Sequence, residues 1–270
     1  MDLCTVGQIK QYLGITDSKS DAILQSLATA YSNRVRKYCG RLFDAQVYNE
    51  SRDGNGQQRL VLRQWPVLSL SSLLVDTYPI SGSSSPLVAG YLLNDSSEPG
   101  DKREITLVGY RFCSGRSNVQ ISYNAGYAPA SVTGEVWNVP ASTPYQVTLL
   151  QSLTFIPGSD SIKYVSGGAS LTRVAGNPAA GQYAISNAGV VSFAAGDAGA
   201  AVSISYQTIG FPVDLSEAVV ELVALRYKSR DWIGYQSKSL AGETVSFVVK
   251  DMPPQVQETL NSYRASYLPP

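Results

Sequence analysis

A charge-poor segment divides this chain into parts of different composition. Of the 21 basic and 21 acidic side chains in the 270-residue sequence, only five fall in residues 131–210. These five are Glu135, Asp160, Lys163, Arg173 and Asp197. The sequence on either side is consistent with one small domain, and insertions are tolerated at exposed loops because few buried contacts are broken there. We therefore expect residues 1–128 and 211–270 to form one discontinuous domain, with an inserted domain over residues 129–210.

The composition argues against several classes of function. The chain contains no histidine, which removes serine–histidine and cysteine–histidine catalysis and histidine metal ligands. No paired-carboxylate motif offers a replacement, so we expect no enzyme activity, no cofactor and no metal site. Cys4, Cys39 and Cys113 form no CxxC pair, which predicts free thiols in a reducing compartment. No apolar run approaches the ~20 residues that span a bilayer, and no secretory pattern opens the sequence, so we expect no membrane association.

The formal net charge of the chain is zero at pH 7. Proteins that bind nucleic acid through many phosphates normally carry a basic excess, because counterion release drives that binding. Tight, sequence-reading DNA binding is therefore disfavoured. One local basic cluster remains, formed by Arg34, Arg36, Lys37 and Arg41. Its cations either sit favourably against a helix dipole or form a basic patch that faces DNA or a neighbouring subunit.

Helices are expected in both flanks. Thr5 and Gln8 have the spacing of a capping box, which predicts a short helix that stops at Gly14. Ser18-Lys19-Ser20-Asp21 can cap a second helix, whose apolar side chains from Leu24 to Tyr38 have helical spacing and precede Gly40, a plausible helix end.

Two more helices are expected in the second flank. One opens at Asp214 and is apolar nearly all round, which predicts burial on more than one side. The other starts at Pro253-Pro254 and carries one apolar stripe, formed by Val256, Leu260, Tyr263 and Tyr267.

Strands are expected between the second and third helices. Asp53-Gly54-Asn55-Gly56 has strong turn chemistry and predicts a hairpin turn. Residues 60–75, a short piece near Tyr91 and residues 105–123 then predict a small antiparallel sheet. The flanks are thus expected to form a small helical domain with an antiparallel hairpin and sheet, so the fold class of the chain is α+β.

The charge-poor segment is expected to be all-β, as a compact β-sandwich or barrel, with an immunoglobulin-like sandwich as the preferred form. Short strand-like pieces separated by turn residues are found at 145–149, 152–156, 162–165, 182–185, 190–193 and 201–206. Four tyrosines fall at strand positions, which favours a place in the core over exposed binding. They are Tyr145, Tyr164, Tyr183 and Tyr206.

The order of several motifs in the flanks resembles the head–tail connector family of tailed bacteriophages, also called adaptor or head-completion proteins. After two opening helices the similar stretches are Tyr48-Asn49-Glu50, Leu60-Val61-Leu62-Arg63 with Trp65-Pro66-Val67, and Asn118-Val119-Gln120-Ile121-Ser122-Tyr123 with Ala125-Gly126-Tyr127. Towards the end they are Glu221-Leu222-Val223-Ala224-Leu225-Arg226-Tyr227, Met252-Pro253-Pro254 and Tyr263-Arg264. In this family Gly-Tyr is usually followed within a few residues by Pro and a helix, whereas about 84 residues intervene here. The resemblance covers residues 1–127 and 211–270, and the pieces around Gln182, Val190 and Ile204 look like a β module of phage structural proteins.

The resemblance implies a virion structural protein at the neck, assembled in the host cytoplasm. It implies a homo-oligomeric ring that matches the twelve-fold portal, extends the DNA channel and helps to retain packaged double-stranded DNA, which passes without sequence recognition. The implied partners are the portal protein, a tail terminator or stopper protein, and further copies of this chain. The inserted domain would brace the ring against capsid or tail proteins, or bind host glycans.

The resemblance also implies contact residues. The family's C-terminal segment commonly reaches the portal, which points to Tyr263, Arg264, Tyr267 and Leu268, although a terminal helix packed on its own domain is an equal alternative. Arg34, Arg36, Lys37 and Arg41 are candidates for the channel wall or the subunit interface. A rival hypothesis is a host-surface glycan- or receptor-binding protein with a helical oligomerisation domain.

Overall fold

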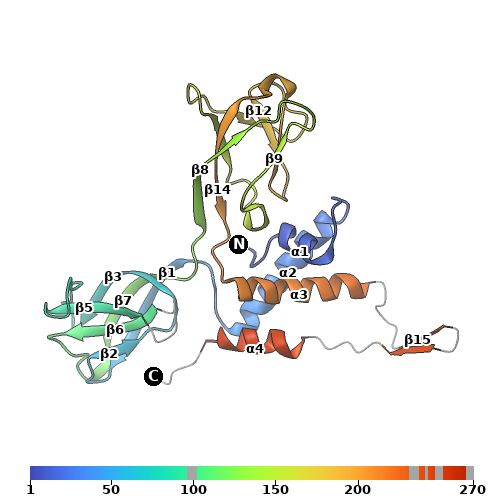
Figure 1. Cartoon of the computed structure of the whole chain (residues 1–270). Helices are drawn as coiled ribbons and strands as arrows, with labels where there is room; N and C mark the ends of the chain where they lie inside the picture. The colour runs from blue at the N-terminus through green and yellow to red at the C-terminus, as the bar shows by residue number, and fades with distance from the viewer. Residues whose placement is uncertain (96–101, 231–236, 241–242, 247–251, 266–270) are drawn as a thin grey trace. The chain divides into compact units, whose positions relative to one another are not determined.

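The protein has a mixed α+β fold with several antiparallel sheets (Figure 1). The structure is a computed structural model that describes residues 1–95, 102–230, 237–240, 243–246 and 252–265. Its contacts divide the chain into two compact units. Unit 1 comprises Met1–Val35 and Pro129–Ser262, and unit 2 comprises Arg36–Ala128 and Tyr263–Pro270. The predicted division at residues 129 and 210 stays a prediction.

The described residues contain four α-helices, each near its predicted position. They are α1 (Val6–Leu13), α2 (Asp21–Cys39), α3 (Val213–Ser229) and α4 (Pro254–Ser262). The capping box is confirmed: the Gln8 backbone N–H donates to the Thr5 hydroxyl, and the Thr5 N–H donates to the Gln8 side chain. Gly14 ends α1 in the left-handed region at φ 70°. Within the part of the chain that the structure describes, no helix is long and apolar enough to cross a membrane.

Helix α3 forms the centre of the helical part of unit 1. It contacts both α1 and α4, and the Ser216 hydroxyl donates to the Leu3 carbonyl at 2.9 Å. The prediction of burial on more than one side is confirmed for most of its length, whereas Leu225 is exposed. Its buried side chains are Leu215, Ser216, Ala218, Val219, Val220, Leu222, Val223 and Ala224.

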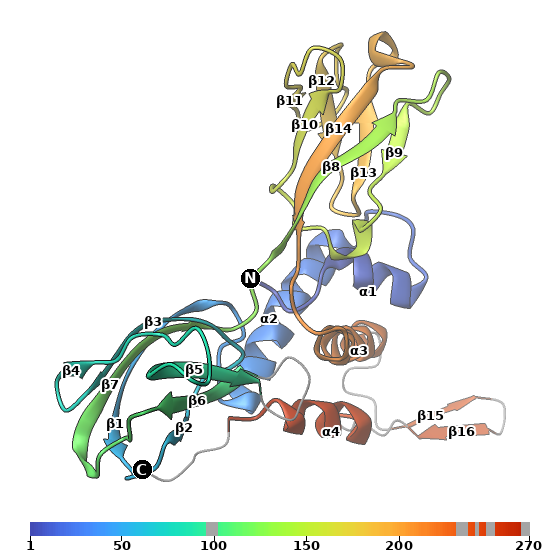
Figure 2. The ribbon, with the colours of Figure 1, turned by 60° about the vertical axis from the view of Figure 1, so that its left-hand side comes forward.

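Two antiparallel sheets of unit 2 share one hydrophobic core (Figure 2). The first has the order β1-β7-β3-β4, with bounds Gln46–Gly54, Gly115–Ala125, Val67–Val75 and Tyr78–Pro79. The second has the order β2-β6-β5, with bounds Arg59–Val61, Lys102–Val108 and Gly90–Asp95. The core comprises Leu60, Leu62, Val67, Leu73, Val75, Ile105, Leu107, Phe112, Val119, Ile121, Tyr123 and Ala125.

The predicted hairpin turn at Asp53–Gly56 is wrong. Strand β1 pairs with β7 and strand β2 pairs with β6, so the turn links two different sheets. The physical reason lies in the backbone partners after the turn: the Gly56 N–H donates to the Phe112 carbonyl at 2.7 Å, and the Phe112 N–H returns a bond to Gln57 at 2.8 Å. Residues 56–57 are therefore held by Phe112 rather than by β1.

The backbone conformation at residue 126 explains why the Ala-Gly-Tyr motif has a glycine at its centre. The φ of Gly126 is +116°, and a Cβ at this position would lie 2.6 Å from the Asp44 carbonyl oxygen. The Gly126 N–H donates to Pro66, and the Tyr127 N–H donates to the Phe43 carbonyl at 2.7 Å. Only glycine lets the chain approach residues 43–44 this closely as it leaves β7.

The charge-poor segment contains two sheets around its own core. One has the order β10-β14-β8, with bounds Ser161–Tyr164, Ala201–Thr208 and Ala130–Asn138. The other has the order β11-β12-β13-β9, with bounds Thr172–Arg173, Gln182–Ile185, Val190–Phe193 and Gln146–Thr148. All pairs are antiparallel except β11 with β12. The core comprises Val139, Val147, Leu149, Phe155, Ile162, Leu171, Tyr183, Val191, Phe193, Val202, Ile204 and Tyr206.

Two predictions for this segment need correction. Residues Ser152–Thr154 form a turn of 3-10 helix instead of a strand, because the Thr154 and Phe155 N–H groups donate back to Gln151 and Ser152. Strand β8, which the sequence pattern did not predict, pairs with β14 along nearly its whole length. Ala130 at the start of β8 is the partner of Thr208 at the end of β14 (Figure 1). The chain therefore enters and leaves this segment at adjacent points.

Two short strands lie between α3 and α4. Strand β15 (Ser237–Leu240) pairs with β16 (Glu243–Ser246) in antiparallel register. For residues 240–247 the sequence predicts a turn and a strand, or an ordered loop, and residues 241, 242 and 247 lie outside the described residues.

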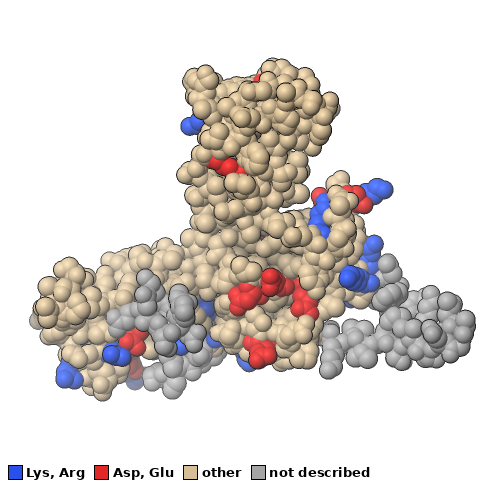
Figure 3. Space-filling model, in the orientation of Figure 1, with Lys and Arg blue, Asp and Glu red and all other residues tan. Residues whose placement is uncertain are grey.

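The three carboxylates of the charge-poor segment accept hydrogen bonds from tyrosine hydroxyls. Tyr206 donates to Glu135 at 2.6 Å, Tyr183 to Asp160 at 2.8 Å and Tyr164 to Asp197 at 2.5 Å. The Asp160 side chain is fully buried and also pairs with Arg173 at 3.0 Å. The few acidic groups of this segment are thus all bonded to its tyrosines. The face of the segment that Figure 3 shows is almost free of charge.

These bonds predict alkaline destabilisation of the charge-poor segment. Burial raises the pKa of Tyr206 to about 12, with a further contribution from its hydrogen bond to Glu135. An unfolded tyrosine ionises near pH 10, so between about pH 10 and 12 the folded state retains a proton that the unfolded state has lost. The free energy of unfolding should fall with rising pH across this window, by up to about 1.4 kcal/mol per pH unit for this tyrosine.

The measurement is urea unfolding at a series of pH values for the wild type and for Tyr206→Phe. The variant should show a shallower fall above pH 10, because this titrating group is gone. An equal slope in both proteins would contradict the assigned role of Tyr206.

Candidate interaction site

The structure brings two of the predicted contact residues to the end of α2. The Tyr263 ring meets the Phe43 ring edge-on at 6.1 Å between centroids. The Arg264 guanidinium lies 5.5 Å from the Tyr38 ring centroid. The Ala265 N–H donates to the Cys39 carbonyl at 2.8 Å, so the chain after α4 is tied to the last turn of α2. Tyr267 and Leu268 lie outside the described residues.

Arg41 lies beneath this contact as a buried cation. It is only 4% exposed, and its guanidinium lies 3.8 Å from the Trp65 ring centroid and 5.1 Å from that of Phe43. It also donates a hydrogen bond to the Trp65 carbonyl. Arg103 lies 5.3 Å from the same indole ring. Stacked guanidinium groups of this kind are stabilised by the ring quadrupole, most strongly when they are removed from water.

We call these residues the arginine–aromatic cluster: Arg36, Tyr38, Arg41, Phe43, Trp65, Arg103, Tyr263 and Arg264. Arg36 joins it through its carbonyl, which accepts a 3.3 Å hydrogen bond from the Arg41 N–H, and its guanidinium pairs with Asp44 at 2.9 Å. Burial raises the pKa of the Cys39 thiol to about 11, although the charges of Arg41 and Arg264 act to lower it. The cluster is thus a concentration of positive charge in a chain of zero net charge.

The four predicted cations of α2 and its end occupy different environments. Arg34 and Lys37 are exposed, and the Arg34 guanidinium lies 5.8 Å from the Tyr31 ring centroid. Arg36 is mostly buried and paired, while Arg41 is enclosed by aromatic rings. Sequence reasoning missed Phe43, Trp65 and Arg103 as members of the cluster. The sequence indicates Trp65 only as part of the Trp65-Pro66-Val67 motif, and no sequence spacing connects this motif to Arg41.

The arrangement is suited to binding. Phe43, Trp65 and Arg41 are buried and support the fold, whereas Arg264 is exposed, and arginine is enriched where protein surfaces meet. Among the residues that the structure describes, no group of three or more histidines, cysteines, aspartates or glutamates is placed to hold a metal ion. The cluster fixes the position of residues 263–265 and places positive charge around them.

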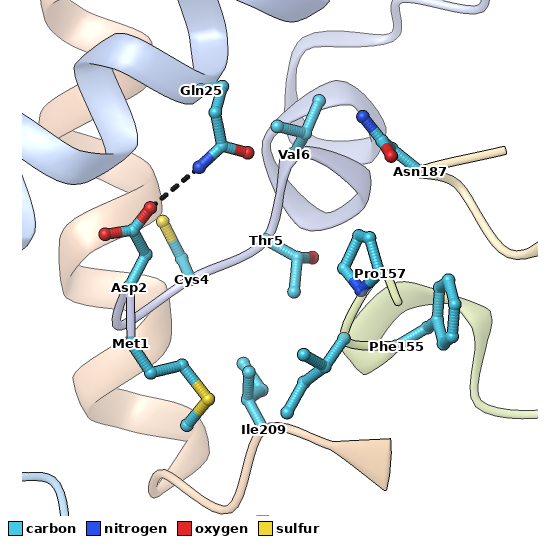
Figure 4. A pocket seen from close by; sticks show the side chains of 11 residues that line it. Met1, Asp2, Cys4, Thr5, Val6, Gln25, Phe155, Pro157, Asn187 and Ile209 are labelled. Carbon is cyan, nitrogen blue, oxygen red and sulfur yellow. Dashed lines mark hydrogen bonds between the residues drawn. The ribbon is translucent and has the colours of Figure 1, made fainter. Parts of the chain in front are cut away.

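Two hollows elsewhere fit a ligand less well. One of about 140 Å³ in unit 1 lies beside Asp2, whose carboxylate accepts a 2.7 Å hydrogen bond from Gln25 (Figure 4). The other, of about 280 Å³, is a shallow hollow over β1, β7 and β3, with Asn49, Ser122 and Gln120 in its lining. Both are smaller than the roughly 300–1,000 Å³ of typical small-molecule sites.

Replacement of Arg41 should destabilise unit 2. Arg41→Ala removes the packing against Trp65 and Phe43 and leaves the Trp65 carbonyl without this donor, at a cost of about 2–3 kcal/mol. Arg41→Lys keeps the charge but loses the planar stack, so it should recover only part of that loss. Chemical denaturation measures both.

Arg63→Ala is the matched control, since Arg63 is exposed in the same unit. It should stay within about 0.5 kcal/mol of the wild type. Equal stability of Arg41→Ala and Arg63→Ala would contradict a structural role for the buried guanidinium.

Comparison with known proteins assigns the chain to a family. A family model described as head completion protein matches residues 2–134 and 146–266. The match includes residues 146–210, which make up most of the charge-poor segment. The family model therefore covers more of the chain than the two flanks on which the resemblance rests. Among curated proteins, none matches the chain. Because the family model covers well over half of the sequence, the chain belongs to the head completion protein family, whose members are structural proteins of the bacteriophage particle.

Proposed function

We propose that this protein forms a ring of subunits between the portal and the tail, where it extends the DNA channel and helps to retain packaged DNA. Family membership supports a role at the head–tail junction. That membership is the observation that carries the proposal, and the attachment of residues 263–265 to the end of α2 holds the exposed Arg264 at a fixed place. An exposed arginine held in this way can serve as a docking contact for another neck protein.

The proposed partners follow from this position. Tyr263, Arg264, Tyr267 and Leu268 would contact the portal protein, and a tail terminator or stopper protein would bind below the ring. The ring would match the portal's twelve-fold symmetry and assemble in the host cytoplasm before it becomes part of the virion neck. Double-stranded DNA would pass through without base recognition, which suits a chain of zero net charge.

The charge-poor segment would form a β-sandwich on the outside of the ring. Its two sheets share one core, and its entry and exit strands pair at Ala130 and Thr208. A bracing role against capsid or tail proteins fits its nearly uncharged exterior better than glycan binding does. Aromatic rings that bind sugars have to be exposed, whereas Tyr183 and Tyr206 are each 2% exposed, and Tyr145 and Tyr164 are half-buried against the same core.

Portal binding should depend on the C-terminal segment. Removal of residues 266–270, or the change Arg264→Glu, should weaken binding to purified portal by about 30-fold or more, as expected for the loss of a central interface contact. The measurement is biolayer interferometry with immobilised portal, supported by thermal unfolding of each variant.

Lys163→Glu is the charge-matched control, because Lys163 is an exposed cation of the charge-poor segment. It should bind portal like the wild type. Full-strength portal binding by both C-terminal variants would refute the proposed docking segment.

The charge-poor segment should be separable from the rest. Residues 129–210 expressed alone should unfold cooperatively, because their core is made within the segment. The remainder, joined across Ala128 and Phe211 by a short glycine linker, should also fold and should keep its affinity for portal. It should be somewhat less stable, because the Thr5 hydroxyl loses its bond to the Leu153 carbonyl.

Circular dichroism with thermal and urea unfolding checks both fragments. A remainder that shows no cooperative transition, together with an unfolded 129–210 fragment, would show that the two parts are one folding unit.

A further inference from the structure

Two exposed cations lie beside the anchored C-terminal segment. Lys37 extends from the last turn of α2 into solvent, and Arg264 is exposed while its guanidinium lies over Tyr38. Neither side chain has an ion-pair partner among the described residues. We call Lys37, Tyr38 and Arg264 the basic surface. Its charge is not neutralised within the described part of the chain, so it is available to a partner of opposite charge.

A surface of opposite charge lies on α3 and α4. Asp214, Glu217 and Glu221 recur at steps of three and four along α3, which places them on one face of the helix. Glu258 is exposed on α4, and the neighbouring Gln255 side chain donates to Glu221 at 3.1 Å. Figure 3 shows acidic atoms gathered over these two helices. We call this helix surface the α3–α4 face.

Charge complementarity identifies a second copy of this chain as the occupant of the basic surface. Glu217 and Glu258 form no ion pair within the described residues, so the α3–α4 face also retains its charge. The two surfaces are different patches of one chain, and a contact between them is head-to-tail. Such heterologous contacts close into rings when the rotation between subunits permits.

DNA is a weaker candidate for the basic surface. Binding to DNA needs several cations, each of which displaces counterions from the phosphates. Only Lys37 and Arg264 supply positive charge to the basic surface. Arg36, which precedes Lys37 in the sequence, adds little charge for phosphate, because its guanidinium pairs with the Asp44 carboxylate at 2.9 Å. A protein face with a few carboxylates matches the charge and the size of the basic surface better than a duplex does.

We propose that Lys37 of one subunit binds the α3–α4 face of the next subunit close to Glu217, while Arg264 beside it remains at the proposed portal contact. This inference rests on the proposed ring and names the surfaces that form its subunit interface. It resolves the choice between channel wall and subunit interface for Lys37 in favour of the interface. Electrostatic pairs of this kind set partner choice and register at an interface.

Charge reversal tests the pairing directly. Lys37→Glu and Glu217→Lys should each weaken self-association about tenfold, because each variant places like charges together at every interface. The double variant Lys37→Glu/Glu217→Lys should recover association, and so should an equimolar mixture of the two single variants, which can alternate around the ring. The readout is sedimentation velocity over a concentration series at low ionic strength.

A cross-linking experiment covers the case of weak association. A variant with Lys37→Cys, Glu217→Cys and Cys113→Ser has two exposed thiols, because Cys4 and Cys39 are buried. A short bis-maleimide should link this variant at high concentration into a ladder that extends beyond the dimer. The matched variant with Lys163→Cys in place of Lys37→Cys should give no such ladder, and Lys163→Glu should associate like the wild type.

Absence of the ladder, or failure of the double variant to recover association, would overturn the proposed interface. The interface would also be rejected if Lys37→Glu associates normally but loses DNA retention, which would place Lys37 on the channel wall. Wild-type binding to portal is measured in parallel. Intact portal binding with a failed charge swap rejects this interface alone, whereas absent portal binding by the wild type rejects the proposed function.

Discussion

The pairing of β8 with β14 is the constraint on which the organisation of this chain depends. It brings Ala130 and Thr208 together, so a segment of about 80 residues can leave and re-enter the chain at adjacent points. Without that pairing, the link between β7 and α3 would have to be a long structureless loop, which compact proteins rarely contain. With it, the helices at the two ends of the sequence can pack on one another, as α1 and α4 both do on α3. The segment also has its own core, in which three tyrosine–carboxylate bonds take up all of its acidic groups.

Local signals in the sequence predicted the helices well. The capping box at Thr5, the glycine at Gly14 and the apolar composition of α3 are short-range features, and each determines local structure directly. Strand partners depend on distant residues and were harder to predict. The turn at Asp53–Gly56 has hairpin chemistry, but the Phe112 backbone competes successfully for Gly56 and Gln57. Strand β8 was missed because it contains Gly134 and several small polar residues, and only its pairing with β14 makes it a strand.

The candidate site could be predicted only in part, because its members come from distant stretches of the sequence. The sequence drew attention to the cations of α2 and to the C-terminal segment as two separate groups. The structure unites Arg36, Arg41 and Arg264 around Tyr38, Phe43 and Trp65, which no local spacing could reveal. It also distinguishes cations of equal formal charge, since Arg41 supports the fold while Lys37 remains exposed. The family match then extended across residues 146–210, which the resemblance of the flanks alone had treated as a departure.

The central claim is that copies of this protein form a ring on the portal with the charge-poor segment outside the channel. The most direct test is electron cryo-microscopy of the purified complex with portal, combined with its mass. We expect twelve copies per portal ring, an open axial channel, and twelve peripheral knobs that disappear when residues 129–210 are removed. A complex of variable stoichiometry, or density from residues 129–210 that blocks the channel, would contradict it.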